Sequence, residues 1–548
     1  MIDFEFIDDG VILLIENGKT IDEEVLDYTA YDIHKNVKEK GTKLIPTAYY
    51  RFMKSHKDLK SIQFDQEDWE TNILPIIGTR MGDVYFPFQR ETIYRMIKNR
   101  KCLNACSPGL GKTIQSLSCL KFFNKPEITN DLILCPSYLR ANWLEEIEKW
   151  FPELVPHCTI VWKAGKKELD QVYVTVFETP GIKILSYDMF ASICTNYKNK
   201  MSAKFGTVLM DESHMIKNGH SKRYTKTAAI LKRSRQAFLL SGTPAPNRPN
   251  ELYTQFSLIS PQTFYDYKTY AWRYCNGHYD RFNRFDDKGS SKTQELSFLM
   301  GKLSLRLRRE DYLDDLPNIV RQKITVSPKT VSKQFHKKKK LFLDMCAKID
   351  HDEDAKKKLQ SMASDMFRDT AAIKVEPVLH YLENYILDDE LEKTILFCKH
   401  QVMMEPIVEF LESNNMGYID ISGATPMKDR MGLIDKFKTD PECKFAVLTI
   451  GSCSTGLNII PIRKMIFLEL DWTPSILDQA EARINRIGGS KHLHYIYLIC
   501  EHSLDNMVFN KLKRKTELLT DVVDGKRERD YDDFKFHEDS KKPKLSTI

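Results

Sequence analysis

The sequence predicts an α/β protein built from two parallel β-sheets. Short apolar runs alternate with longer amphipathic stretches, this alternation stops once in the middle of the chain, and it then resumes. Each apolar run ends at polar residues or turn formers, which is typical of parallel strands joined by helices. The length of 548 residues also exceeds what a single hydrophobic core usually holds. We therefore expect two α/β lobes.

The first lobe is expected over 84–322 and the second over 375–502. Strands of the first lobe are expected at these apolar runs: Cys102–Ala105, Leu132–Leu134, Ile182–Leu185, Val208–Met210 and Phe238–Leu240. Strands of the second lobe are expected at Thr394–Phe397, Ala446–Thr449 and Met465–Leu468. In open parallel sheets, ligands bind beyond the carboxyl ends of the strands, so the residues after each run are the first place to look for function.

The remaining segments have a different composition. Residues 1–80 carry mixed charge and predict a small N-terminal module, with a strand near 11–15. Residues 323–374 are expected to form a helical insertion or linker, with helix over 332–368; for the lysine run at 337–340 we favour a solvated helix face over phosphate contact. A closing helix is expected within 503–524. The tail at 525–548 is dense in charge and predicts disorder.

The overall composition excludes several classes of protein. The chain has 82 basic and 76 acidic residues, so a nucleic-acid footprint would have to be a local basic surface. Its 12 cysteines form no CxxC pair, which indicates buried thiols in a reducing compartment rather than a zinc site or a disulfide framework. The acidic N-terminus is unlike a secretory signal, and no apolar run is long enough to span a bilayer.

A glycine-rich loop follows the first expected strand. The run Cys106–Thr113 has P-loop spacing, although Cys106 stands where the first glycine is usual. Gly109 and Gly111, on either side of Leu110, let backbone amides approach phosphate oxygens without a Cβ clash. Lys112 is expected to pair with the β- and γ-phosphates, and Thr113 to face Mg²⁺. The loop therefore predicts binding of a nucleoside triphosphate with magnesium.

Two carboxylates follow the strand expected at Val208–Met210. Asp211 is expected to hold Mg²⁺ through water, and Glu212 to orient the attacking water. Adjacent acids in a strand point to opposite sides, which would separate these two roles. After the next strand come Ser241, Gly242 and Thr243. The hydroxyls of Ser241 and Thr243 can hydrogen-bond to an acid on a neighbouring strand, so we interpret this run as coupling the nucleotide to a second site.

A basic motif lies far downstream, in the second lobe. Arg483 and Arg486 are three residues apart, so on a helix they would share one face. Two guanidinium groups from a second lobe can stabilise the charge that develops on a transferring γ-phosphoryl group. Gln479, in the same motif, is a further catalytic candidate. Together with the P-loop and the acids, these residues predict a motor driven by a nucleoside triphosphate with Mg²⁺.

With these motifs in this order, the sequence resembles a Swi/Snf-type ATPase of helicase superfamily two over about 84–520. Further matching segments are Phe86–Gln89, Leu134–Ser137 with Asn142-Trp143, Leu185–Asp188 and Ser454–Asn458. Within that family the chain most resembles the annealing-helicase, or HARP-like, branch. The segments that carry this resemblance are Arg248–Gln255, Arg273–Cys275, Gly289–Ser291, Arg308-Arg309 leading to Leu316-Pro317, Ser422–Pro426 with Arg430, and Trp472–Pro474.

The resemblance implies two RecA-like lobes that close on ATP and grip duplex DNA, with Gln89 at the adenine edge. It also implies translocation along the duplex without ordinary strand separation, and in this branch the rewinding of unpaired DNA and the remodelling of stalled forks. The partners expected are double-stranded or branched DNA and replication or repair proteins, with no membrane. We expect a monomer in the nucleus, where the basic run Lys541–Lys544 would serve import.

The sequence departs from the family at several positions, and alternatives stay open. Cys106, Ser107 and Pro108 alter the first half of the P-loop, while Asn485 and Gly489 replace the usual His and Gln beside the arginines. The runner-up function is a nucleosome or protein–DNA complex remodeler. A nucleic-acid-binding scaffold with a decayed ATPase is a third hypothesis, and an RNA helicase a fourth.

Overall fold

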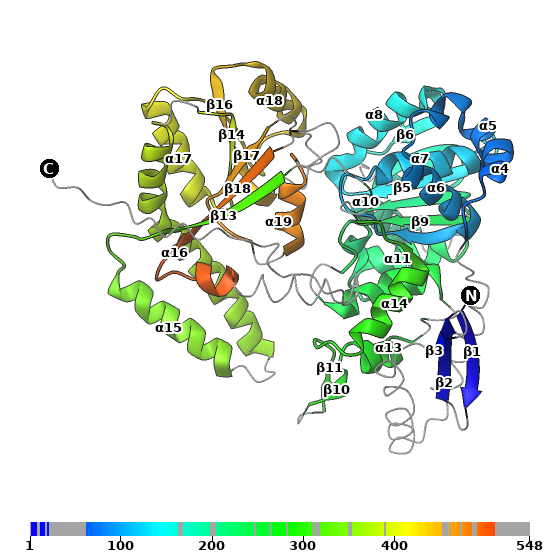
Figure 1. The fold of residues 1–548 in the computed structure, drawn as a ribbon, viewed down its shortest axis with the longest axis horizontal. Coiled ribbons are helices and arrows are strands. Elements are labelled where there is room, and N and C mark those ends of the chain that lie inside the picture. The colour runs from blue at the N-terminus through cyan, green and yellow to red at the C-terminus, as the bar shows by residue number, and fades with distance from the viewer. Residues whose placement is uncertain are drawn as a thin grey trace. The chain divides into compact units, whose positions relative to one another are not determined.

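A computed structural model of the chain is shown in Figure 1. The structure describes residues 2–7, 11–16, 19–20 and 62–509, apart from gaps at 163–167, 198–203, 246–247, 262–263, 265, 281–282, 309–311, 313–317, 349–352, 388–390, 452–458, 460–461, 472–473, 485–489 and 491. The chain divides into two compact units, with the boundary between Tyr312 and Leu313. Each unit contains one large sheet in which every pair of neighbouring strands is parallel. The predicted pair of parallel α/β lobes is confirmed.

The sheet of the first unit has seven strands. In spatial order they are β12 (Ser304–Leu305), β4 (Lys101–Asn104), β9 (Gln236–Leu240), β8 (Thr207–Asp211), β5 (Asn130–Cys135), β7 (Gly181–Ser186) and β6 (Cys158–Ile160). The five strands predicted from apolar runs are confirmed as β4, β5, β7, β8 and β9. The two edge strands, β6 and β12, have three and two residues and too few apolar positions to form a recognisable run.

The helices of the first unit surround this sheet. They are α6 (Pro87–Asn99), α7 (Lys112–Phe123), α8 (Arg140–Trp150), α9 (Leu169–Phe177), α10 (Tyr187–Asn196), α11 (Lys222–Leu231), α12 (Tyr253–Ile259), α13 (Tyr267–Tyr274) and α14 (Thr293–Leu303). A short hairpin pairs β10 (His278–Tyr279) with β11 (Phe285–Asp286).

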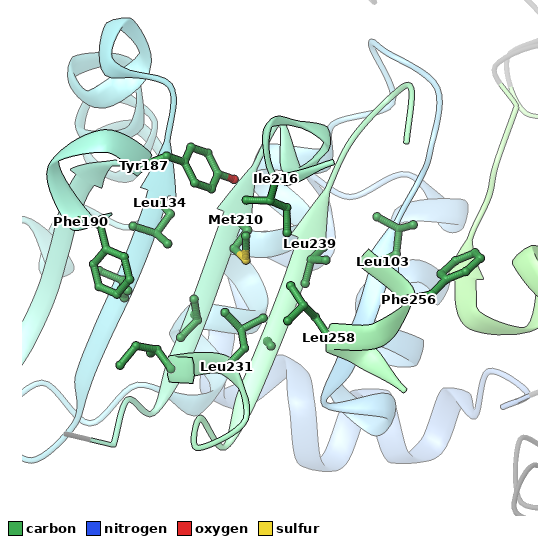
Figure 2. Close-up of a cluster of buried hydrophobic side chains, with 14 of the residues drawn as sticks. Leu103, Leu134, Tyr187, Phe190, Met210, Ile216, Leu231, Leu239, Phe256 and Leu258 are labelled. Atoms are coloured by element: carbon green, nitrogen blue, oxygen red, sulfur yellow. The ribbon is translucent and has the colours of Figure 1, made fainter. Parts of the chain in front are cut away.

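Each face of the first sheet buries its own hydrophobic core. Leu134, Met210 and Leu239 lie on one face, with Phe190 of α10 and Leu231 of α11 packed in the same cluster (Figure 2). The strand residues one position away, Ile133, Leu209 and Phe238, belong to the core on the other face, together with Leu117 of α7. Successive side chains of a strand point to opposite faces, so a continuous apolar run is what a doubly covered sheet requires.

Residues 62–82 pack into the first unit instead of forming part of a separate module. They form α4 (Gln66–Asp68), a π-helical turn (Trp69–Ile73), α5 (Leu74–Ile77) and a 3₁₀ turn (Thr79–Gly82). Trp69, Ile73 and Ile77 are at most 2% exposed and share a core with α6 and α7. The predicted module boundary near residue 80 is corrected, because burial of these apolar side chains joins the segment to the lobe.

Nearer the N-terminus, three strands form a small antiparallel sheet. They are β1 (Ile2–Ile7), β2 (Val11–Glu16) and β3 (Lys19–Thr20), in that spatial order. The strand predicted near 11–15 is therefore confirmed as β2. The rest of the predicted N-terminal module, 21–61, lies outside the described residues.

The sheet of the second unit has six strands. In spatial order they are β13 (Asn318–Val326), β18 (His492–Cys500), β17 (Lys464–Phe467), β14 (Thr394–Cys398), β16 (Cys443–Thr449) and β15 (Gly417–Ile421). The three predicted strands are confirmed as β14, β16 and β17. β13 pairs with β18 along its whole length, from Asn318 opposite His492 to Val326 opposite Cys500. A lobe boundary at 322/323 would cut this strand, so the structure moves it towards the N-terminus.

The helices of the second unit are α15 (Lys333–Lys348), α16 (Glu353–Tyr385), α17 (Gln401–Ser413), α18 (Met427–Thr439) and α19 (Pro474–Glu481). The helix predicted over 332–368 is confirmed by α15 and α16. However, α16 continues past 374, and its Phe367 and Val378 lie in the two cores of this unit. The helices are therefore built into the second lobe and do not form a linker.

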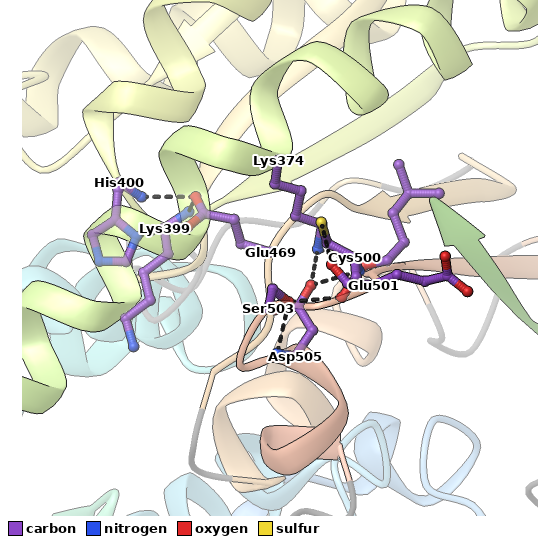
Figure 3. A network of polar contacts seen from close by, with 9 residues as sticks. Lys374, Lys399, His400, Glu469, Cys500, Glu501, Ser503 and Asp505 are labelled. Atoms are coloured by element: carbon purple, nitrogen blue, oxygen red, sulfur yellow. Dashed lines mark hydrogen bonds and ion pairs between the residues drawn. The ribbon is translucent and has the colours of Figure 1, made fainter. Parts of the chain in front are cut away.

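A buried ion pair ties α16 to the end of β18. The ammonium of Lys374 lies 2.6 Å from the carboxylate of Asp505, and both side chains are at most 6% exposed (Figure 3). The same carboxylate accepts the backbone N–H of Cys500 at 2.9 Å. Beyond residue 509, the predicted closing helix lies outside the described residues, as does the predicted tail.

The ten cysteines that the structure describes are free thiols, and nine of them are buried. Among the helices of the described part, none combines the length and the apolar character needed to span a bilayer.

Candidate nucleotide-binding and hydrolysis site

Three of the predicted motifs meet at one edge of the first sheet. The P-loop follows β4, Asp211 ends β8 and Ser241 follows β9, and these strands are neighbours in the order β4-β9-β8. Because the strands are parallel, their carboxyl ends lie at the same edge. The contact is close: a Cβ added at Gly242 would lie 3.0 Å from Cγ of Pro108 and 3.4 Å from Nζ of Lys112.

The P-loop has the backbone that phosphate binding requires. Gly109 and Gly111 have φ of +88° and +81°, a left-handed conformation that favours glycine. Lys112 begins α7, and its ammonium donates to the carbonyls of Cys106 at 2.8 Å and Ser107 at 3.3 Å. Burial lowers the pKa of Lys112 from its ordinary value, while the negative charges of Glu212 and Asp211 oppose this shift.

Two fully buried amides support the loop from below. Asn104, the last residue of β4, donates to Gln115 of α7 at 2.7 Å and accepts the backbone N–H of Cys106 at 3.2 Å. Gln115 in turn donates to the carbonyl of Leu110 at 3.0 Å. Sequence reasoning did not identify this pair. The sequence did offer a signal, because Asn104 is a polar residue at the end of a buried strand and Gln115 is one on the buried face of a helix.

Gln89 lies against the P-loop, while its implied position at the adenine edge stays a prediction. Its amide donates to the carbonyl of Leu110 at 3.2 Å and accepts the N–H of Phe86 at 3.1 Å, where it caps the start of α6. A Cβ added at Gly111 would lie only 2.5 Å from Nε2 of Gln89. The glycine at this position therefore makes room for Gln89, and the side chain is only 5% exposed.

The two acids are held in different ways. One carboxylate oxygen of Asp211 accepts the indole N–H of Trp143 at 3.0 Å, and the other accepts the backbone N–H of Glu212 at 2.9 Å. Burial, together with the charge of Glu212, raises the pKa of Asp211 to about 6, and the hydrogen bond from Trp143 opposes this rise. The hydroxyl of Tyr187 donates to the backbone carbonyl of Asp211 at 2.7 Å.

The predicted reason for the separation of the two carboxylates is wrong. Asp211 is the last residue of β8, and Glu212 is not in the strand: its φ is +49° and its ψ +50°, in the left-handed region. Its side chain is therefore directed by a strained turn rather than by strand alternation. Non-glycine residues held in sparsely populated backbone conformations cluster at functional sites, and Glu212 is such a residue.

His214 connects the acids to the Ser-Gly-Thr segment. Its Nδ1 lies 3.1 Å from the hydroxyl of Ser241 and 3.3 Å from a carboxylate oxygen of Glu212. The Ser241 hydroxyl also accepts the backbone N–H of Thr243 at 3.2 Å. Burial lowers the pKa of His214 to about 4, so the imidazole is neutral at pH 7. Ser241 thus contacts His214, and the same ring nitrogen lies beside Glu212.

The donor set suits a hydrated magnesium ion bound with a triphosphate. Mg²⁺ usually takes one or two protein ligands and completes its octahedron with phosphate and water oxygens. The site offers Thr113 and Asp211, and no cluster of three or more His, Cys, Asp or Glu side chains fit for a metal was found in the described part. The hydroxyl of Thr243 is also buried without a hydrogen-bond partner among the described residues. These residues fit the group that the sequence implied.

In the second unit, the structure places Gln479 on α19 and Arg483 after its end. The helix ends at Glu481, and the N–H groups of Arg483 and Ile484 then bond to carbonyls three residues back instead of four. Nε of Arg483 is buried and has no hydrogen-bond partner within the described ranges. Arg486 lies outside the described residues. The chain thus tightens into a turn at Arg483, and a shared face for the two arginines stays a prediction.

A buried ion pair fixes the end of α19. The guanidinium of Arg321, on β13, contacts the carboxylate of Glu481 through two nitrogens, one of them at 2.5 Å. The hydroxyl of Tyr497 donates to the same carboxylate. Burial alone would lower the pKa of Arg321, but the charge of Glu481 holds it above its ordinary value. Arg483 therefore lies two residues after Glu481, which this ion pair holds to β13.

A second polar cluster lies where β14 and β17 end. Glu469 accepts the backbone N–H groups of Lys399 and His400 at 2.7 and 2.9 Å, and its other oxygen lies 2.6 Å from Nδ1 of His400 (Figure 3). Nζ of Lys399 lies 2.8 Å from Asp471. Sequence reasoning did not single out this cluster, although two acids directly after an apolar run were a usable signal.

The chain is similar to known families and proteins along most of its length. A family model described as "SNF2-related domain" matches residues 38–376, and one described as "Helicase conserved C-terminal domain" matches residues 377–488. The protein named "DNA annealing helicase and endonuclease ZRANB3" from Bos taurus is 32% identical over 466 residues, 83% of this chain and 42% of its own length.

Two other relatives carry a different name. The protein named "SWI/SNF-related matrix-associated actin-dependent regulator of chromatin subfamily A-like protein 1 homolog" from Caenorhabditis elegans is 30% identical over 443 residues, 80% of this chain and 61% of its own length. The similarly named protein from Drosophila melanogaster is 30% identical over 462 residues, 83% of this chain and 58% of its own length. The chain thus spans about two to three fifths of the length of these relatives.

Proposed function

The chain belongs to the SNF2-related family, and we propose that it is an ATP-dependent translocase on double-stranded DNA that anneals or remodels branched DNA such as stalled replication forks. The observation that carries the proposal is the meeting of P-loop, Asp211 and Ser-Gly-Thr segment at one sheet edge. DNA-stimulated ATP hydrolysis is the activity that this arrangement would supply. We expect it to act as a monomer in the nucleus, with replication or repair proteins as partners.

The residues of the first unit divide the work of nucleotide binding. The amides at Gly109–Gly111 and the ammonium of Lys112 would hold the β- and γ-phosphates, and Gln89 would lie at the adenine edge. In doing so, Lys112 would exchange its contacts with the carbonyls of Cys106 and Ser107 for phosphate oxygens. Thr113 and Asp211 would hold Mg²⁺, which neutralises phosphate charge when bound. The bonds from Trp143 and from the N–H of Glu212 keep the Asp211 carboxylate fixed.

Glu212 is suited to orient and deprotonate water. His214, whose Nδ1 lies 3.3 Å from the Glu212 carboxylate, is neutral at pH 7 and so does not form an ion pair with it. The left-handed backbone sets the Glu212 side chain apart from Asp211. Arg483, Arg486 and Gln479 of the second unit would then supply groups that act on the transferring phosphoryl during hydrolysis. Ser241, bonded to His214, would report the state of Glu212 to the Ser-Gly-Thr segment.

The altered P-loop does not favour the hypothesis of a decayed ATPase. Cys106 directs its thiol to the carbonyl of Leu305 at 3.5 Å, on the side of the neighbouring strand. Lys112 contacts the P-loop carbonyl of Cys106, and Asp211 is held by Trp143 and by the N–H of Glu212. The name of one set of relatives, "DNA annealing helicase", favours action on DNA structure. The name of the other set, "regulator of chromatin", supports a nucleosome or protein–DNA complex remodeler as the second candidate.

A comparison of nucleic acids tests the proposal. We expect ATP hydrolysis by the full chain to rise with duplex and forked DNA, to rise further with forked than with fully paired DNA, and to respond weakly to single-stranded DNA or RNA. A larger response to nucleosomes than to the same DNA without histones would favour the remodeler. Stimulation by RNA alone would favour the RNA helicase.

A second assay tests whether the protein rewinds or separates DNA strands. A splayed duplex with a fluorophore and a quencher on its two unpaired arms should lose fluorescence when ATP is added, because rewinding brings the arms together. Strand separation with a gain of fluorescence would contradict the annealing function. A nucleotide with a non-hydrolysable γ-phosphate should give no change.

A further inference from the structure

Arg306 joins two motifs of the candidate site from a position that no motif includes. Its Nη1 donates to the backbone carbonyl of Ala105, at the start of the P-loop, at 2.6 Å. The same nitrogen lies 3.4 Å from the carbonyl of Gly242, in the Ser-Gly-Thr segment. Hydrogen bonds from a charged donor are stronger than those between neutral groups, so this guanidinium holds the two loops together.

The backbone around Arg306 is bonded to the same part of the P-loop. The carbonyl of Leu305 accepts the N–H of Ala105, and the carbonyl of Leu307 accepts the N–H of Ser107, both at 2.9 Å. The Cys106 thiol adds a bond to the carbonyl of Leu305 at 3.5 Å. The segment 305–307 therefore extends the pairing of β12 with β4 into the loop that would hold the phosphates.

The segment 305–307 lies close to the end of the first unit. Six residues after Arg306, at Tyr312, the first unit ends and the chain passes to the second. The P-loop, the Ser-Gly-Thr segment and the exit of the first unit are thus linked through one side chain. Because Arg306 contacts a carbonyl of each loop, a shift of one loop against the other must either lengthen one of these contacts or move Arg306.

We propose that Arg306 is a positioning residue that couples the nucleotide-dependent geometry of the P-loop and the Ser-Gly-Thr segment to the chain leaving the first unit. This rests on the proposed DNA-stimulated ATPase. Arg306 bonds to main-chain carbonyls of both loops, so its contribution is to their relative position. Its loss should reduce the response of hydrolysis to DNA more than hydrolysis itself.

The test compares Arg306→Gln, Arg306→Lys and wild type in the full chain. Arg306→Gln is expected to lower the DNA-stimulated kcat about ten-fold or more, a size typical of coupling between two sites. The kcat without DNA, and the affinity for a fluorescent ATP analogue, should each change by less than about three-fold. Lysine keeps the charge but not the planar fork, so Arg306→Lys should recover part of the stimulation.

Arg284→Gln is the matched control, because Arg284 is 43% exposed and pairs at 3.3 Å with Asp280, four residues away. It should keep the wild-type ratio of stimulated to unstimulated rate. Equal losses in both rates and in nucleotide affinity for Arg306→Gln would overturn the proposal, since a general structural role or a direct contact with phosphate would act on all three. If Arg306→Gln does not fold, an unchanged ratio in Arg306→Lys overturns it.

The outcomes also separate this proposal from the proposed function. Wild-type protein that hydrolyses ATP without any response to DNA contradicts the translocase itself. Wild-type protein that responds to DNA, with an Arg306→Gln variant that responds by the same factor, contradicts only the role of Arg306.

Discussion

In the proposed chemistry, Lys112 serves ATP binding and Glu212 serves hydrolysis. Lys112→Ala should abolish ATP binding and turnover, because the ammonium is the charge that faces the phosphates. Glu212→Gln should lower turnover about 100-fold or more with ATP binding kept, since the amide cannot act as a base. DNA binding should survive in both variants. ATP hydrolysis, nucleotide affinity and DNA affinity are the three measurements.

Lys121→Ala is the control for this pair of variants. Lys121 lies on the same helix as Lys112 and makes a surface ion pair with Glu153 at 2.9 Å, so its loss should leave all three quantities near wild type. Undiminished hydrolysis in Lys112→Ala or Glu212→Gln would refute the assignment of the site.

His214 predicts a loss of stability in acid. Its pKa is lowered to about 4 in the folded protein, whereas the unfolded chain takes up this proton near the ordinary value of about 6.5. Below about pH 6.5 the unfolded state therefore binds more protons, and the folded state loses stability progressively until about pH 4; above pH 6.5 the group has no effect. At pH 5 the expected cost is about 2 kcal/mol.

Urea unfolding at pH 7.5 and pH 5.0 measures this cost. Wild type should lose about 2 kcal/mol more than His214→Gln on going to pH 5.0. His380→Gln, which changes an imidazole that is 78% exposed, should lose as much as wild type. An equal loss in wild type and His214→Gln would show that the imidazole does not titrate as its burial implies.

Residue by residue, the sequence predicted the groups whose chemistry is distinctive and missed those that act through geometry. The P-loop, Asp211 and Ser241 were identifiable because glycine, carboxylate and hydroxyl stand at strand ends. Asn104 and Trp143 were not assigned roles, because an amide or an indole has many uses and only the fold shows which carbonyl or carboxylate it faces. The conformation of Glu212 was also beyond the sequence, which gives no sign of a left-handed residue.

At the scale of the element, central strands were predictable and edge strands were not. β5, β8 and β14 are buried on both faces, so their sequences are unbroken apolar runs. β13 is an edge strand, and Arg321, Gln322 and Lys323 interrupt its apolar pattern. Because of this interruption, the sequence predicts a lobe boundary inside β13, although this strand pairs with β18 along nine residues.

The ion pair between β13 and α19 gives a prediction at this scale. Arg321→Ala should destabilise the second unit by about 3–5 kcal/mol, because it leaves the buried carboxylate of Glu481 without its cation and with the hydrogen bond from Tyr497 alone to offset its charge. Arg463→Ala is the control: Arg463 and Glu392 are 59% and 43% exposed, so their pair should contribute at most about 1 kcal/mol. Urea unfolding followed by fluorescence and circular dichroism measures both. Similar losses in the two variants would contradict the structural role of the buried pair.

At the scale of the whole molecule, the repeat of one architecture was predictable and its limits were not. Both units contain a parallel sheet with function expected beyond the carboxyl ends of the strands, and the alternation of runs indicates this twice. The limits moved because long-range burial sets them: Trp69 joins the first core from outside the predicted first lobe, and Phe367 of α16 joins a core of the second unit from within the predicted insertion. Only tertiary contacts assign such segments to a unit.

The two units are expected to cooperate in hydrolysis. Arg486→Ala in the full chain should lower the DNA-stimulated kcat by about a thousand-fold while nucleotide affinity changes little, because a guanidinium of this kind acts on charge that develops in the transition state. Arg483→Ala is expected to act in the same direction. Its Nε is buried and unpartnered within the described part of the chain, and its position follows the anchored Glu481. Arg463→Ala again serves as the control. Rapid-quench hydrolysis and analogue binding, measured on the same preparations, separate rate from affinity. If affinity collapsed while the rate of the bound enzyme held, these arginines would be binding groups, and charge from the second unit would have no part in the chemistry.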